Sequence, residues 1–232
     1  MKFIKKIFRY IRLLPKLIKA KYYTKKANKE LQKGNLEKAK DYYLKVEKMD
    51  LINYMIYHNV GSIFFQLRDF DKAEEYFKKA IDLNPKNVVS YSTLSEVYLR
   101  KKRWKDAEDI IEKALEIEPF NYFLKKRKKK IFNKNWRKNY VESLEKTEKA
   151  LNQQQKGNIK EAKESFEKAV KLNNKNTTAH FLYGTMLYNQ GNYDKAIKHV
   201  SMAVEFSNNK RYSAVLNQMQ KELNEKNIKK PK

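Results

Sequence analysis

The chain has 232 residues, of which 41% are hydrophobic and 34% are charged, so it can form one elongated domain or two small ones. It has no cysteine, which excludes disulfides, thiolate nucleophiles and cysteine-ligated metals. With only 5 glycines and 4 prolines, sharp turns are few, and this favours helices over a many-stranded sheet. The formal net charge of +26 would attract anionic partners, such as nucleic acid, phospholipid headgroups or acidic proteins.

Residues 1–19 are predicted to form a basic amphipathic helix. Its apolar side is an expected membrane face made of Phe3, Ile4, Ile7, Phe8, Ile11, Leu14 and Ile18. Charged residues interrupt the apolar positions every few residues, so we expect neither a membrane-spanning helix nor a signal peptide. Two interpretations stay open. The helix either lies in a membrane interface or uses its apolar face to cover the structure that follows it.

The segments 20–121 and 143–210 share a fixed internal period. Related stretches are centred on Ala39, Ala73, Ala107, Ala162 and Ala196. Three of the four intervals are 34 residues, and the remaining interval of 55 equals 34 plus an insertion of 21. All five glycines fall on the same register, either inside the first helix of a unit or in the turn that follows it. A period of 34 residues is typical of a helix–turn–helix unit.

The second of these units is similar to the tetratricopeptide repeat. It matches the family pattern by class at Tyr57, Val60, Gly61, Phe64, Ala73, Phe77, Ala80 and Pro85. The resemblance implies an all-α, right-handed superhelical solenoid with repeats 1–3 in residues 20–121 and repeats 4–5 in residues 143–210. It also implies an interaction scaffold or adaptor that binds peptide segments of partner proteins in a concave groove.

The same resemblance implies which side chains line the peptide groove. They are Met55, His58, Ser62, Phe65, Gln66, Val89, Ser92, Glu96, Leu99, Arg100, Phe181, Thr185, Tyr188 and Asn189. An open alternative is that some of them belong to the core. Family members that clamp a C-terminal carboxylate use three cationic side chains, and none is present at the equivalent positions Thr24, Asn28, Asn59, Val89 and Thr93. We therefore expect no such clamp.

Residues 122–142 are predicted to form a basic, aromatic helical insertion. A short helix near 122–132 would close the first block, and a long helix from about 136 would open the second. Its expected anionic-partner patch comprises Lys125, Lys126, Arg127, Lys128, Lys129, Lys130, Lys134, Trp136, Arg137 and Lys138. Such residues suit single-stranded nucleic acid through phosphate contacts and base stacking. The favoured alternative is a solvated basic helix whose aromatic side chains pack on the repeats.

Residues 211–228 are predicted to form a C-terminal capping helix with one polar face. The positive charge is concentrated elsewhere, because residues 1–30 carry a net +10 and residues 120–141 carry +9 of the total of +26. This concentration points to an anionic partner for these two segments without identifying it.

No catalytic constellation is recognisable in the sequence. The 3 histidines lack a second ligand at metal-binding spacing, so we expect no enzyme, no metal and no cofactor. The expected partners are one or more proteins, with an anionic membrane surface as a further candidate and nucleic acid as the less favoured alternative. We expect a cytoplasmic protein and leave open its peripheral attachment to the inner face of a membrane.

Overall fold

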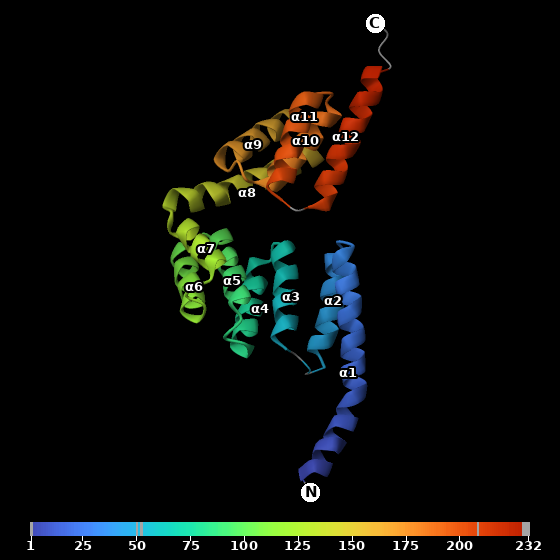
Figure 1. The fold of residues 1–232 in the computed structure, drawn as a ribbon, viewed down its shortest axis with the longest axis vertical. Helices are drawn as coiled ribbons and strands as arrows, with labels where there is room; N and C mark the ends of the chain where they lie inside the picture. The colour runs from blue at the N-terminus through green and yellow to red at the C-terminus, as the bar shows by residue number, and fades with distance from the viewer. Residues whose placement is uncertain (1, 50, 52, 208, 229–232) are drawn as a thin grey trace. The chain divides into compact units, whose positions relative to one another are not determined.

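The computed structural model describes residues 2–49, 51, 53–207 and 209–228, and these form twelve α-helices and no strand (Figure 1). Side chains are described for residues 13–49, 51, 53–207 and 209–225. The predicted all-α class is therefore confirmed. The chain divides into two compact units, Met1–Asn133 and Lys134–Lys232.

The helices alternate between a leading and a trailing member of each pair. The first unit contains α1 (Lys2–Gln32), α2 (Leu36–Glu47), α3 (Tyr54–Gln66), α4 (Phe70–Leu83), α5 (Val88–Arg100), α6 (Trp104–Ile117) and α7 (Tyr122–Phe132). The second unit contains α8 (Lys134–Gln155), α9 (Ile159–Leu172), α10 (Thr177–Asn189), α11 (Tyr193–Glu205) and α12 (Lys210–Ile228). The complete pairs are α1–α2, α3–α4, α5–α6, α8–α9 and α10–α11.

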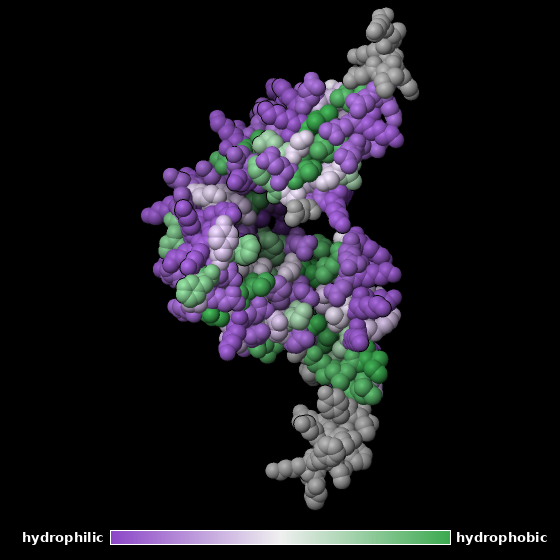
Figure 2. Space-filling model, viewed as in Figure 1, coloured by the Kyte–Doolittle hydropathy of each residue, from purple (hydrophilic) through white to green (hydrophobic). Residues whose placement is uncertain are grey.

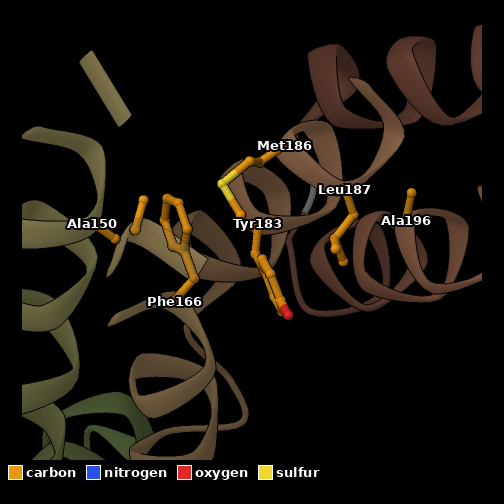
Figure 3. Close-up of a cluster of buried hydrophobic side chains, with 7 residues drawn as sticks. Ala150, Phe166, Tyr183, Met186, Leu187 and Ala196 are labelled. Atoms are coloured by element: carbon orange, nitrogen blue, oxygen red, sulfur yellow. The ribbon is translucent and has the colours of Figure 1, made fainter. Parts of the chain in front are cut away.

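Small residues in the trailing helices allow the paired helices to pack closely. The five repeating alanines, Ala39, Ala73, Ala107, Ala162 and Ala196, all have 0% exposure. In the second unit, Ala196 belongs to a buried cluster with Phe166, Tyr183 and Leu187 (Figure 3). The Phe166 and Tyr183 rings stack with centroids 5.8 Å apart, which joins α9 to α10.

The turns within the helix pairs share a left-handed backbone conformation. Gly34, Gly157 and Gly191 have φ of +80°, +79° and +78°. Arg68 and Lys102 occupy the same place in the second and third repeats, with φ of 66° and 58°. Only glycine adopts this conformation without a steric penalty, which explains why three of the five repeats carry it.

Asparagines cap the leading helices, a signal that the sequence analysis did not use. The side chains of Asn53, Asn87, Asn121 and Asn176 accept hydrogen bonds from backbone N–H groups in the first turns of α3, α5, α7 and α10. Each cap satisfies a helix-terminal N–H that has no partner within the helix.

The N-terminal segment is organised differently from the expectation. Residues 2–19 are continuous with the leading helix of the first repeat, because α1 runs through Pro15 to Gln32. The segment 122–142 divides where the sequence predicted, since α7 ends the first unit and residues 134–142 open α8 of the second. Neither α1 nor α8 contains a glycine, because the first glycine of the chain is Gly34 and the next one after Gly61 is Gly157. Glycine therefore interrupts neither of these two long helices.

A buried carboxylate joins α4 to the turn between α5 and α6 in the first unit. Glu74 of α4 is 7% exposed and accepts hydrogen bonds from Lys78 and Lys101 at 2.7 Å and from Arg103 at 2.8 Å. Burial alone would raise the pKa of Glu74, but the hydrogen bonds from Lys101, Lys78 and Arg103 outweigh it and lower the pKa from 4.5 to about 2.

This network predicts an acid-sensitive contribution to stability. Because the pKa of Glu74 is lower in the folded than in the unfolded state, its ionised carboxylate stabilises the fold fully above pH 4.5. This contribution is lost as the pH falls towards about 2. We expect Glu74→Gln to lower the free energy of unfolding by about 2 kcal/mol at pH 7 and to flatten its fall at acid pH. Urea titrations of both proteins from pH 7 to pH 2 measure this. If the unfolding free energies of the two proteins fell in parallel with pH, the stabilising role of ionised Glu74 would be contradicted.

Candidate functional site

Side-chain contacts align three helices of the first unit into one row. His58 Nδ1 of α3 lies 3.1 Å from Ser90 Oγ of α5, and burial lowers the pKa of His58. Arg127 of α7 donates hydrogen bonds of 2.7 Å to the Ser95 hydroxyl and the Glu96 carboxylate of α5. These contacts join α3 to α5 and α5 to α7.

Helix α7 follows the same register as the leading helices. Tyr54, Val88 and Tyr122, the first residues of α3, α5 and α7, are spaced by the repeat period of 34. The third and tenth residues of all three helices are buried, and in α7 these are Leu124 and Ile131. Helix α7 therefore has the register of a leading helix, and no trailing helix follows it in the described part of the first unit. The sequence analysis had placed it off the register. The interval from Val88 and the Asn121 cap were the signals that could have revealed it.

The second residue of each helix in the row is a highly exposed apolar side chain. Met55 is 54% exposed, Val89 is 58% exposed and Phe123 is 79% exposed. We call these three residues the apolar row. Met55 and Val89 were predicted groove residues, whereas Phe123 was not. Their shared register places all three on the corresponding face of adjacent helices.

The surroundings of the apolar row are positively charged. Lys126 and Lys130 are exposed at the fifth and ninth positions of α7. Glu96 is the ninth residue of α5, and its carboxylate is paired with Arg127 at 2.7 Å. Near α1, an open pocket of about 500 Å³ is lined by Lys21, Lys25, Asn28 and Ile56, among others.

The other predicted groove residues of the first unit differ in accessibility. Leu99 is only 1% exposed, so it is a core residue and not part of an open groove. Phe65 and Arg100 both contact the Phe70 ring, at centroid distances of 5.5 and 5.0 Å. Ser62, Ser92 and Gln66 retain at least partial exposure.

In the second unit, α12 contacts the predicted groove side chains of α10. Phe181 stacks on Tyr212 with ring centroids 4.1 Å apart. Tyr188 donates a 2.6 Å hydrogen bond to Glu222, and that bond raises the pKa of Tyr188 to about 12. Both aromatic groove residues therefore have partners within the unit. Thr185 is half-buried and Asn189 is exposed.

The residues of the predicted anionic-partner patch belong to two units, and some of them have partners within their own unit. Arg127 is paired with Glu96, and Lys128 is paired with Glu112 at 2.8 Å. Arg137 is 9% exposed, and Trp136 stacks on Tyr140 with centroids 4.7 Å apart. The six remaining lysines are exposed: Lys125, Lys126, Lys129 and Lys130 in the first unit, and Lys134 and Lys138 in the second.

The described part of the predicted membrane face is open to solvent. Leu14 is 50% exposed and Ile18 is 61% exposed, and the nearby Leu17 and Tyr22 are 40% and 54% exposed. Figure 2 shows the corresponding hydrophobic surface on α1. The side chains of Phe3, Ile4, Ile7, Phe8 and Ile11 lie outside the described residues. Leu14 and Ile18 are therefore not covered by the first repeat.

The remaining asparagines of the carboxylate-clamp positions have structural roles. Asn28 accepts a hydrogen bond from the Tyr43 hydroxyl, and Asn59 donates to the same oxygen at 2.9 Å. Tyr43 is fully buried. Both asparagine side chains are therefore engaged with Tyr43.

Among the described residues, no helix is long and apolar enough to cross a membrane. Within the same residues, no group of three or more histidine, cysteine, aspartate or glutamate side chains could hold a metal. His180 and His199 contact each other through Nδ1 atoms 2.9 Å apart. Burial lowers the pKa of both histidines, and that of His199 falls to about 4.

Comparison with known proteins relates most of the chain to one repeat family. The tetratricopeptide repeat matches residues 20–53, 54–87, 76–109 and 147–210. No curated protein matches the chain.

Several solved structures resemble the fold. The first tetratricopeptide domain of Spaghetti (RPAP3), solved with an HSP90 peptide, is 29% identical, with a TM-score of 0.45, and the match covers 49% of this chain and 90% of that one. MamA from Desulfovibrio magneticus RS-1 is 20% identical, with a TM-score of 0.43 and coverages of 81% and 94%. PilF from Pseudomonas aeruginosa is 18% identical, with a TM-score of 0.43 and coverages of 92% and 88%.

Proposed function

Because the chain belongs to the tetratricopeptide repeat family, we propose that it is a non-enzymatic interaction scaffold whose first unit binds a peptide segment of a partner protein. The observation that carries this proposal is the apolar row, in which side chains 54% to 79% exposed recur at one register of adjacent helices. Burial of such side chains by a ligand is favourable, and helices hold them in place at little entropic cost.

Selection from a library of displayed random 12-residue peptides tests this proposal on the full chain. We expect Val89→Ser to weaken binding of the selected peptides about tenfold, because the lost apolar contact is worth about 1.4 kcal/mol. Leu83→Ser is the matched control, since Leu83 lies on the trailing helix α4 and is 53% exposed. Failure to select any peptide, or equal affinities of both variants, would refute the groove.

A second part of the proposal concerns α1, which we place on an anionic membrane surface at the cytoplasmic face. Leu14, Leu17 and Ile18 provide exposed apolar surface, and the exposed Lys16 and Lys19 lie among them in sequence. An amphipathic helix of this kind lies in the interface, where apolar side chains enter the acyl boundary and lysines meet anionic headgroups.

Vesicle flotation tests the membrane contact with full-length protein and vesicles containing phosphatidylserine. We expect Leu14→Ser/Ile18→Ser to reduce the vesicle-bound fraction more than about tenfold at limiting lipid, because two apolar anchors are lost. Met55→Ser/Val89→Ser removes side chains of similar exposure from the groove and should float like the parent protein. Equal flotation of the parent and the α1 variant would exclude this role for α1.

A further inference from the structure

We propose that the peptide bound by the first unit is acidic and carries large apolar side chains, which contact the apolar row while its carboxylates pair with Lys126 and Lys130. This inference rests on the proposed function and specifies the chemistry of the partner. It also assigns a binding role to α7, whose residues were expected to act separately from the groove.

The first step of the argument is the position of the lysines of α7. Because α7 follows the leading-helix register, Phe123, Lys126 and Lys130 correspond to Val89, Ser92 and Glu96 of α5. The lysines therefore lie on the face that carries the apolar row. Two further basic residues of the run contact acidic residues of the neighbouring helices: Arg127 binds Glu96 and Lys128 binds Glu112.

The second step is the charge balance of this face. Glu96 is the only acidic residue at the second, fifth and ninth positions of α3, α5 and α7, and Arg127 compensates its charge. Lys126 and Lys130 then supply the positive charge on the face of α7 that carries Phe123. Lys21 and Lys25 of α1 line the pocket near Ile56, at the α1 side of the row. An acidic segment complements this face, and such complementarity governs orientation and association rate.

The third step separates a peptide from a nucleic acid. Binding of single-stranded nucleic acid relies on aromatic side chains on which successive bases stack. In the apolar row only Phe123 is aromatic, whereas Met55 and Val89 are aliphatic. Aliphatic side chains in register are suited to apolar peptide side chains, and methionine adapts readily to their shapes.

The experiment uses lysines that are matched in their local contacts. Lys126 lies over the Tyr122 ring at 5.7 Å, and Lys125 lies over the Phe120 ring at 5.3 Å, with both lysines exposed. We expect displayed peptides selected on the full chain to be enriched in aspartate and glutamate next to leucine or phenylalanine. Lys126→Glu should weaken their binding about tenfold at 150 mM salt, whereas Lys125→Glu should change it less than about twofold.

A second matched pair tests the apolar contribution of α7. Phe123 and Phe120 are 79% and 90% exposed, so serine at either position should leave the thermal unfolding midpoint nearly unchanged. Phe123→Ser should weaken the selected peptides about tenfold, whereas Phe120→Ser should leave their affinity unchanged. Equal effects of the two substitutions would overturn the role of α7.

The outcomes distinguish this inference from the proposed function. Selected peptides that lack acidic residues but require Val89 would overturn the acidic partner and leave the groove in place. Failure to select peptides would overturn both proposals. Fluorescent oligouridylate provides the nucleic-acid arm: binding at 150 mM salt that Lys125→Glu and Lys126→Glu weaken equally would overturn the acidic-peptide assignment in favour of RNA.

Discussion

Replacing Gly184 with alanine is expected to destabilise the second unit by about 2–3 kcal/mol. An added Cβ would lie 2.6 Å from Val200 Cγ2, 2.9 Å from the Ala196 carbonyl oxygen and 3.1 Å from the Val200 backbone nitrogen. Two of these atoms belong to the backbone of α11, so α10 and α11 must separate to relieve the contact. The higher helix propensity of alanine offsets only about 1 kcal/mol of this cost.

Gly61→Ala is the matched control in the first unit. The three atoms nearest to its added Cβ all belong to the Phe77 ring, the closest at 3.1 Å, and this side chain would have to shift by a few tenths of an ångström. We therefore expect a change in unfolding free energy of less than about 1 kcal/mol, because helix propensity compensates for the crowding.

Tryptophan fluorescence can follow the two units separately during urea unfolding. Trp136 lies in α8 of the second unit, and Trp104 lies in α6 of the first. Trp104→Phe leaves Trp136 as the probe for Gly184→Ala, whereas Trp136→Phe leaves Trp104 as the probe for Gly61→Ala. Equal costs for the two alanines would contradict the close packing inferred at Gly184. Partial recovery by Val200→Ala in the Gly184→Ala background would identify the clash as the cause.

Asn176→Ala is expected to cost about 3 kcal/mol, because it removes a helix cap and a buried hydrogen-bond network together. Asn176 is 5% exposed, and its side-chain oxygen accepts from the Ala179 N–H at 3.0 Å. Its amide nitrogen donates to the Ser143 hydroxyl at 2.8 Å and to the Thr147 hydroxyl at 3.0 Å. The substitution leaves the Ala179 N–H without its capping acceptor. It also removes the two side-chain hydrogen bonds that join the start of α10 to α8.

Two variants separate the contributions at Asn176. Asn87→Ala removes the equivalent cap of α5, where Asn87 accepts from the Val89 N–H, and should cost about 1 kcal/mol. Asn176→Ser keeps a capping oxygen but lacks the amide donor, so it should fall between the two alanine variants. Urea unfolding measures all three. A cost for Asn176→Ala no greater than that for Asn87→Ala would show that the buried network contributes little.

The repeat architecture could be predicted because it depends on local, periodic chemistry. The small residues at Ala73 and Ala107 and the turn glycines such as Gly157 recur at a fixed interval, and each has a single packing or backbone reason. Departures such as Arg68 and Lys102 in left-handed turns did not obscure the period.

The candidate site was less predictable, because it depends on contacts between distant segments. The pairing of Arg127 with Glu96 joins residues 31 apart and removes both from the available charge. The run of basic residues in α7 also obscured its leading-helix register, since the periodic apolar signal there reduces to Leu124 and Ile131. Likewise, the contact of Tyr212 with Phe181 depends on how α12 packs, which the sequence pattern does not specify.

Backbone chemical-shift mapping with the tightest displayed peptide tests the central claim most directly. For the full-length, ¹⁵N-labelled protein, we expect the largest amide shifts around Met55, Val89 and Phe123 in α3, α5 and α7. The trailing helices α4 and α6 should show smaller changes. Shifts concentrated in α4 and α6, or in the second unit, would contradict binding on the leading-helix face of the first unit.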